Sequence, residues 1–205
     1  VEAITKGCEN LARHITNIEK FGVPVAVAIN EYYTDTESEH QAIIDFCSAL
    51  GVACKISSHW SNGGPGAADL AKHVADLVDT QKSSFKTLYS DDMALWDKTK
   101  HIAKTIYGAA DIIADKKVRQ KFLKLEEDGF GKYPICMAKT QYSFSTDPLL
   151  MGAPSGHDVP IREVRLSAGA EFIVVVCGEI MTMPGLPRKP ASEAIGIDKD
   201  KNIEG

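Results

Sequence analysis

Aromatic side chains stand directly after two short apolar runs of the sequence. Tyr32 and Tyr33 follow the first run, and His59 and Trp60 follow the second. Tyr32 and Trp60 are 28 residues apart, one strand–helix–strand step, so we expect their rings to project from neighbouring loops at one sheet edge. A flat heteroaromatic ligand would fit between two such rings, and each stacked ring contributes about 0.5–1.5 kcal/mol beyond its buried area. The spacing equally allows one or both rings to pack on a helix end.

Strands and helices alternate in the part of the chain that must position these rings. The run Val23–Asn30 is rich in β-branched residues and lacks polar alternation, which is typical of a central strand buried on both faces of a parallel sheet. Thr36 and Glu39 have the spacing of a capping box, so a helix is predicted to begin near Thr36 and to end at Gly51. A second strand over 52–56 and another helix complete the βαβα pattern of a doubly wound sheet.

Helices and then strands are predicted in the rest of the chain. The helices lie over 93–107 and 116–128, and the strands lie over 134–138, around Arg162 and Arg165, and over 171–177. We therefore expect an α/β protein with a mostly parallel sheet flanked by helices, and a smaller C-terminal α+β portion. The predicted division gives a βαβα portion that carries the aromatic loops and a strand-rich portion with Pro/Gly-rich loops, residues 1–130 and 131–205.

Two other features near Trp60 have residue types that could do chemistry. The turn Gly63–Gly66 precedes a helix, where backbone N–H groups can receive an anion, but it lacks the Lys-Ser/Thr of a P-loop. A simple turn leading into the helix is the preferred interpretation. His59 would serve as an acid or base, or would only form a hydrogen bond. No Ser/His/Asp arrangement and no metal-ligand spacing emerges, so the catalytic residues stay unassigned and no metal site is predicted.

The segment 181–187 has an unusual composition, Met-Thr-Met-Pro-Gly-Leu-Pro. Its prolines and glycine prevent regular hydrogen bonding, so its backbone groups would be free to bind a ligand, and methionine side chains adapt well to a planar ring. The alternative is a rigid turn that ends the domain.

The overall composition excludes several classes of protein. The 205 residues include 23 basic and 28 acidic side chains, for a formal net charge of −5, with no basic stripe that would neutralise nucleic-acid phosphates. No apolar run is long enough to cross a membrane, and no secretory signal pattern is present. The five cysteines are widely spaced and most have apolar neighbours, which favours free thiols in a reducing cytoplasm. A small molecule or a protein is the expected partner.

Several strings of the sequence, taken in order, resemble formate–tetrahydrofolate ligases. The two most specific are Lys139-Thr-Gln-Tyr-Ser143 and Thr182-Met-Pro-Gly-Leu-Pro187. The other matching stretches are Phe21–Asn30, Thr34–Glu37, His59-Trp60 with Gly63-Gly64, Ile106–Ala109, Gly129–Gly131 and Pro134–Ala138. The likeness covers the chain almost end to end, but it corresponds to the C-terminal part of a longer family chain.

The resemblance implies an ATP-dependent ligase that joins formate to tetrahydrofolate. In this family formyl phosphate forms first, and the folate nitrogen then attacks it to give 10-formyltetrahydrofolate, ADP and phosphate. It implies that Tyr32 and Trp60 sandwich the pterin, and that Thr182, Met183, Pro184, Gly185 and Leu186 approach the nucleotide. It also implies Mg²⁺ with ATP, a monovalent cation, a homo-oligomer and a cytoplasmic location.

The chain departs from the family pattern in two ways that matter for function. Glu31-Tyr32-Tyr33 stands where Arg-Phe-Pro is more usual, so the first loop loses a positive charge and a rigid proline. The family's P-loop belongs to the N-terminal part and is absent from this sequence. We therefore expect this segment alone to be inactive and to need the missing N-terminal part as its partner. The rival interpretation is a non-catalytic folate- or nucleotide-binding or assembly module of the same fold.

Overall fold

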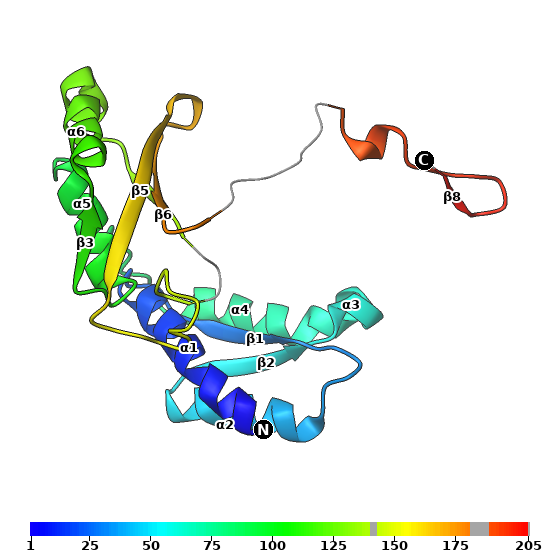
Figure 1. The fold of residues 1–205 in the computed structure, drawn as a ribbon. Coiled ribbons are helices and arrows are strands. Elements are labelled where there is room, and N and C mark those ends of the chain that lie inside the picture. Colours follow the sequence, from blue (N-terminus) through cyan, green and yellow to red (C-terminus); the bar gives the residue numbers. More distant parts are fainter. Residues whose placement is uncertain (140–142, 181–188, 205) are drawn as a thin grey trace.

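The computed structural model describes residues 1–139, 143–180 and 189–204, and its elements form two regions (Figure 1). The first, which we call the ring-bearing region, runs from residue 2 to residue 80. Its elements are α1 (Glu2–Glu19), β1 (Ala26–Asn30), α2 (Glu37–Ala49), β2 (Ala53–Ser57), α3 (His59–Asn62), the 3₁₀ turn η1 (Gly64–Ala67) and α4 (Ala68–Thr80).

Strands β1 and β2 pair in parallel, with Asn30 opposite Ser57 at their carboxyl ends. Helix α4 lies on one side of this pair, and α1 and α2 lie on the other (Figure 1). The prediction that the run beginning at Val23 is a central strand buried on both faces was wrong in this structure. Within the described residues β1 pairs only with β2, and Ala28 is exposed while Ile29 alone in β1 is fully buried.

The local signals for α2 act as expected. One carboxylate oxygen of Glu39 accepts hydrogen bonds from the backbone N–H and the hydroxyl of Thr36, at 3.0 and 2.8 Å. Gly51 follows the helix with φ +73°, a conformation that side-chain-bearing residues rarely adopt. The capping box and the glycine stop therefore set the length of the helix that separates the two aromatic loops.

The second region, which we call the sheet region, covers residues 95–177. Its four strands have the order β3-β5-β6-β4, in which β5 and β6 are antiparallel and the two outer pairs are parallel. Helices α5 and α6 lie on the same side of the sheet (Figure 1). Its elements are α5 (Leu95–Thr105), β3 (Asp111–Ala114), α6 (Lys116–Leu125), the turn η2 (Glu126–Phe130), β4 (Ile135–Ala138), β5 (Asp158–Ser167), η3 (Ala168–Ala170) and β6 (Phe172–Cys177).

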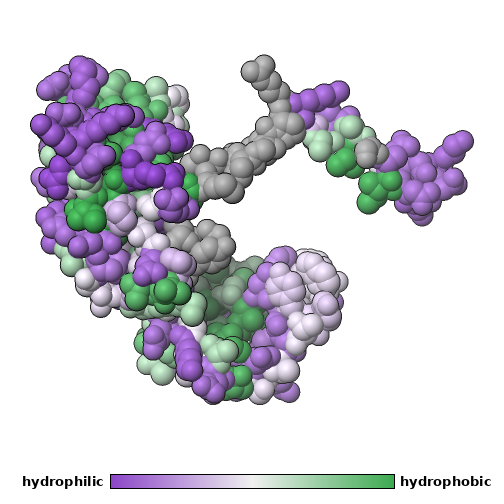
Figure 2. Space-filling view, viewed as in Figure 1, coloured by the Kyte–Doolittle hydropathy of each residue, from purple (hydrophilic) through white to green (hydrophobic). Residues whose placement is uncertain are grey.

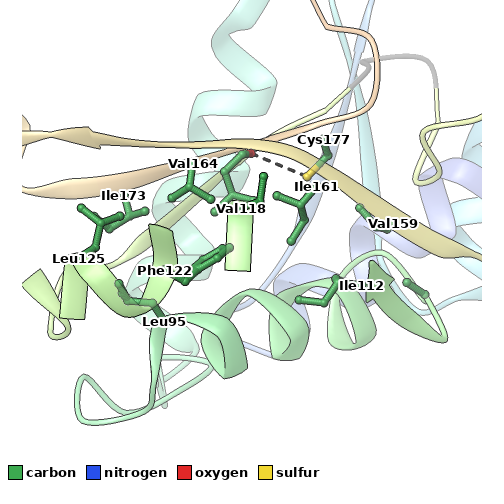
Figure 3. Packing of buried hydrophobic residues seen from close by; sticks show 13 residues of the cluster. Leu95, Ile112, Val118, Phe122, Leu125, Val159, Ile161, Val164, Ile173 and Cys177 are labelled. Atoms are coloured by element: carbon green, nitrogen blue, oxygen red, sulfur yellow. Dashed lines mark hydrogen bonds between the residues drawn. The ribbon is translucent and has the colours of Figure 1, made fainter. Parts of the chain in front are cut away.

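The largest hydrophobic cluster of the described residues lies between these two helices and the sheet. Figure 3 shows the ring of Phe122 among side chains from both layers, with Leu95 below it and Val118 and Val164 above it. The thiol of Cys177 points to the carbonyl of Val175, 3.7 Å away. The cluster members of β6 alternate along the strand, as expected for one buried sheet face. Those of β5 alternate up to Ile161 and resume at Val164, because the register shifts between Ile161 and Glu163.

A lysine is completely buried at the edge of this cluster. Lys98 of α5 donates from Nζ to the carbonyls of Gly131 and Tyr133, at 2.8 and 3.1 Å. Burial lowers the pKa of Lys98, and the nearby carboxylates, Asp91 first among them, oppose that shift. Because two main-chain carbonyls depend on this ammonium, Lys98 ties the turn after α6 to α5.

Helix α1 connects the two regions through side-chain hydrogen bonds. The buried amide of Asn17 donates to the carbonyl of Ile106 at 2.9 Å. Asn10 donates to the carbonyl of Gly152 at 2.9 Å, and Arg13 donates to the carbonyl of Ala153 at 3.2 Å. These bonds join one helix of the ring-bearing region to the end of α5 and to the loop before β5.

The described C-terminal residues, 189–204, form a short 3₁₀ turn and a two-stranded hairpin. They comprise η4 (Ala191–Glu193), β7 (Gly196–Ile197) and β8 (Ile203–Glu204). In Figure 2 this segment lies apart from the rest and carries hydrophobic surface, to which its exposed Ile195, Ile197 and Ile203 contribute. No helix in the described part of the chain is long and apolar enough to cross a membrane.

The expected fold class is confirmed: the structure is mixed α/β, with parallel strands flanked by helices and a small antiparallel hairpin. Strand β3 was not predicted. It comes from the portion before residue 130 and pairs with β5 from the portion after it, so a single sheet includes strands from both portions. The proposed division at residue 130 therefore stays a prediction about folding units.

Candidate functional site

The carboxyl ends of β1 and β2 place two loops side by side. Because Asn30 and Ser57 are register partners, the loops that follow them begin at the same level of the sheet. The N–H of Glu31, the first loop residue, donates to the carbonyl of Ser57 at 3.1 Å. This bond continues the ladder by one step and couples the two loops directly.

The rings of Tyr32 and Trp60 meet at this edge. Their centroids are 6.4 Å apart and their planes are inclined by 29°. Tyr32 is 54% exposed and Trp60 is 66% exposed, so both rings face solvent. The structure thus brings together the two residues that the sequence singled out, whereas Tyr33, at 87% exposure, projects into solvent.

Hydrogen bonds in its own loop hold the backbone of Tyr32. The carboxylate of Asp35 accepts from the N–H of Tyr32 at 2.8 Å, and the N–H of Asp35 donates back to the carbonyl of Tyr32 at 3.0 Å. The same Asp35 oxygen lies 3.4 Å from Nε2 of His40, and Nδ1 of His40 lies 3.9 Å from Glu31. The bond from Tyr32, and then His40, lowers the pKa of Asp35. The contacts of Asp35 in this loop therefore favour its charged form.

A tight turn holds Trp60. Trp60 lies on the one-turn helix α3, whose N-terminal neighbour Ser58 donates its N–H to the carbonyl of Gly66 at 3.0 Å. A Cβ at Gly66 would lie 2.6 Å from the carbonyl carbon of Ser58, so only glycine permits this approach. The glycine turn thus packs against the chain before Trp60, which agrees with the interpretation of Gly63–Gly66 as a turn leading into a helix.

His59 is tied to the strand end. Its Nδ1 lies within hydrogen-bond distance, 3.0 Å, of the hydroxyl of the buried Ser57. This contact links the start of α3 to the end of β2. Of the two roles expected for His59, acid or base and hydrogen-bond partner, the structure shows the hydrogen bond. The surface at the α3 end is drawn in pale colours in Figure 2, which marks intermediate hydropathy.

The second predicted site segment lies outside the described residues. The segment 181–188 includes all five predicted nucleotide contacts, so their contribution stays a prediction: Thr182, Met183, Pro184, Gly185 and Leu186.

Of the Lys139–Ser143 string, the two end residues are described. Lys139 donates from Nζ to the carbonyl of Ser143 and lies 5.2 Å from the ring centroid of Tyr107. Burial lowers the pKa of Lys139 and raises that of Tyr107 to about 12.

The described part of the chain contains no cluster of side chains that would bind a metal ion and no disulfide. There, no group of three or more His, Cys, Asp or Glu side chains is arranged to hold a metal ion. All five cysteines are free; three of them are buried, Cys54 is partly buried and Cys136 is exposed. Burial raises the pKa of Cys177 to about 12, so its thiol behaves as a core group.

Comparison with known proteins agrees with the string matches. The family model for formate–tetrahydrofolate ligase matches residues 1–205, the whole chain. The chain belongs to the formate–tetrahydrofolate ligase family. Curated formate–tetrahydrofolate ligases are 58% identical in Sinorhizobium medicae, 57% in Granulibacter bethesdensis and 55% in Pelagibacter ubique, each over all 205 residues. In each case the chain spans 36% of the relative's length.

The sequence singled out Tyr32 and Trp60, and the structure adds two residues that it did not single out. Asp35 and His40 lie behind Tyr32, one as its hydrogen-bond acceptor and the other buried against that acceptor. The one sequence signal for Asp35 is its place within the matched string Thr34–Glu37. His40 has none, because its partners are set by how α2 packs below the loop.

Proposed function

We propose that this chain carries the tetrahydrofolate-binding face of an ATP-dependent ligase that joins formate to tetrahydrofolate. The observation that carries the proposal is the pair of solvent-facing rings, Tyr32 and Trp60, held 6.4 Å apart at the carboxyl edge of two parallel strands. Family membership supports the choice of ligand, because the matched relatives are named for tetrahydrofolate.

A flat ligand between the two rings would need them to move apart. A planar ring inserted between two others needs about 7 Å between the outer planes, twice a contact distance of about 3.5 Å. The separation of the ring planes is at most the 6.4 Å between the centroids, so it is smaller than that value. A pterin would therefore have to separate the rings, and the exposed Tyr32 side chain has room to turn. In the unliganded protein the two rings shield part of each other's surface instead.

In the proposed reaction ATP supplies the activation of formate. Phosphoryl transfer from ATP to formate gives formyl phosphate and ADP, and the folate nitrogen then displaces phosphate to give 10-formyltetrahydrofolate. The residues of this chain hold and orient the pterin, so that the nitrogen meets the acyl carbon from a fixed direction. Positioning of this kind replaces a bimolecular encounter by an effectively intramolecular one.

Other parts of the proposed enzyme lie beyond the described site. We assign Thr182 to Leu186 as nucleotide contacts on the family resemblance alone, and we assign no ligand for Mg²⁺ or a monovalent cation within this chain. The P-loop that would hold the ATP phosphates is absent from the sequence. The chain by itself is therefore proposed to be inactive, with the missing N-terminal part as its partner in a cytoplasmic homo-oligomer.

A titration with tetrahydrofolate tests the binding proposal. Trp96 packs in the sheet region against Phe122 and Arg119, so a Trp96→Phe chain leaves Trp60 as the single indole reporter. We expect saturable quenching of Trp60 by tetrahydrofolate in that background. Trp60→Ala, measured by calorimetry, is expected to weaken binding by about 1–3 kcal/mol because it removes one stacked ring. Trp96→Phe alone is expected to bind as the unaltered chain does.

Two results would redirect the proposal. If tetrahydrofolate neither quenched Trp60 fluorescence nor gave a binding signal in calorimetry, a non-catalytic assembly module would be favoured over a folate-binding face. Formate-dependent release of ADP by this chain alone would contradict the proposed need for the N-terminal part. Addition of that part from a relative, such as the Granulibacter bethesdensis ligase, is expected to restore turnover if the chain is the complementary segment.

A further inference from the structure

The loop that carries Tyr32 contains two acidic side chains. Glu31 and Asp35 lie on either side of Tyr32 in the sequence. Both carboxylates lie near the imidazole of His40, Glu31 at 3.9 Å and Asp35 at 3.4 Å. His40 is only 8% exposed, so this contact is made below the surface on which the Tyr32 ring lies.

The geometry makes Asp35 the central member of this group. Its carboxylate accepts from the Tyr32 N–H at 2.8 Å and lies 3.4 Å from Nε2 of His40, so it links the backbone of the ring-bearing residue to a buried side chain of α2. The reverse bond, from the Asp35 N–H to the Tyr32 carbonyl at 3.0 Å, closes the loop on itself. Together these bonds fix the direction in which Cα of Tyr32 presents its side chain.

The orientation of the ring is otherwise weakly constrained. Tyr32 is more than half exposed, and in the described part of the chain its ring pairs with that of Trp60, itself two-thirds exposed. An exposed aromatic side chain held by one neighbour changes rotamer readily, so the loop backbone controls where the Cα–Cβ bond points and which rotamers are allowed. The distance between the two rings therefore depends on the loop backbone more than on side-chain packing.

We propose that Asp35 is a positioning residue for folate binding: by accepting from the Tyr32 N–H while resting against His40, it holds the Tyr32 ring over Trp60. The proposal rests on the proposed function for its ligand, but the ring contact itself is a property of the unliganded chain. Asp35 does not touch the pterin in this scheme. It acts through the backbone of Tyr32.

The test uses two variants of Asp35 and one matched control. Asp35→Ala removes the acceptor. Asp35→Asn keeps an oxygen acceptor for the Tyr32 N–H while removing the negative charge. Asp45→Ala removes another exposed carboxylate, on α2 itself, which accepts from the side-chain amide of Gln41 at 2.7 Å. All three variants alter solvent-facing positions, so unfolding midpoints close to that of the unaltered chain are expected, and they verify the fold of each variant.

The first readout is the ring contact without ligand, measured as nuclear Overhauser effects between Tyr32 and Trp60 protons. We expect the effects in the unaltered chain, in Asp35→Asn and in Asp45→Ala, and their loss in Asp35→Ala. The second readout is the dissociation constant for tetrahydrofolate. We expect Asp35→Ala to raise it roughly 3- to 10-fold, the effect of one lost hydrogen bond, and Asp35→Asn to restore it to within about 2-fold.

The two readouts separate the two proposals. A folded Asp35→Ala chain that keeps the Tyr32–Trp60 contact would overturn the positioning role, whatever the folate result. The same role would also fail if Asp35→Asn lost the contact as completely as Asp35→Ala. A lost contact with an unchanged dissociation constant would instead overturn the ring sandwich of the proposed function, because the rings would then contribute nothing to folate binding.

Discussion

The ring-bearing region and the sheet region differ in how they use their apolar side chains. The sheet region encloses a continuous cluster between two helices and four strands (Figure 3). In the ring-bearing region no side chain of α4, all of whose residues are described, is fully buried, and Val78 is 73% exposed. Packing thus concentrates in one region, while the candidate site lies on loops of the other. Loops positioned by a scaffold are a common location for binding residues.

The largest expected effect comes from the core of the sheet region. Phe122→Ala removes a ring that is buried against Leu95 and Val118, and the cavity is expected to reduce the free energy of unfolding by about 3–5 kcal/mol. Urea denaturation followed by circular dichroism measures the change. Leu123→Ala, at an exposed neighbouring position of α6, serves as the control and is expected to change it by about 0.5 kcal/mol or less. Equal effects of the two variants would mean that the buried cluster does not stabilise the sheet region.

A smaller effect is expected in the turn that carries Trp60. Gly66→Ala places a methyl group 2.6 Å from the backbone carbon of Ser58, so the turn must shift at a cost of about 1–3 kcal/mol. Gly64→Ala is the matched control, because its Cβ would meet no atom within 4 Å. Thermal unfolding measures stability, and Trp60 fluorescence in the Trp96→Phe background reports the turn itself. An unperturbed Gly66→Ala chain would show that the close approach does not hold α3.

The smallest effect is a pH dependence confined to the Tyr32 loop and the start of α2. The pKa of Asp35 is lowered first by its bond from Tyr32, and that of Glu39 by its bonds from Thr36. Groups with a lowered folded-state pKa contribute stability above their unfolded pKa values, near 4, and that stability is lost as the pH falls further. Amide exchange, corrected for its intrinsic pH dependence, should show Tyr32 and Thr36 losing part of their protection as the pH falls below about 4.

The matched site for that measurement is the N–H of Ile173, which donates to the carbonyl of Pro134 in the sheet region and depends on no carboxylate. We expect its protection to persist at pH values where that of Tyr32 declines. Parallel losses at both sites would mean that acid unfolds the molecule as one unit, and the contrast in local stability would be wrong.

Local sequence signals predicted much of the ring-bearing region. Thr36, Glu39 and Gly51 define α2 through contacts within a few residues of each helix end, so residue type and spacing were enough to predict both ends. The pairing of Tyr32 with Trp60 also followed, because consecutive strands joined by one helix usually lie in parallel beside each other. Burial of the first strand was overestimated, since its composition indicates what it can bury and not which neighbours are present.

Contacts between distant elements could not be predicted in this way. The four residues of β3 were missed because so short a strand has too little periodicity to distinguish it from the end of a helix connection. Lys98 gave no sign that its ammonium would be buried among the carbonyls of Gly131 and Tyr133. The contact of His40 with Asp35 spans only five residues, but no motif in the sequence indicated it.

The amino-acid sequence by itself therefore determined the lengths of the main helices, the loops that bear the rings and the family to which the chain belongs. The tertiary structure alone decided the strand order β3-β5-β6-β4, the 6.4 Å between the Tyr32 and Trp60 rings, and the support that Asp35 and His40 give to one of them. The physical reason is range. Capping and turn preferences act over a few residues, whereas the strand order and the distance between the rings depend on how elements far apart in the chain pack together.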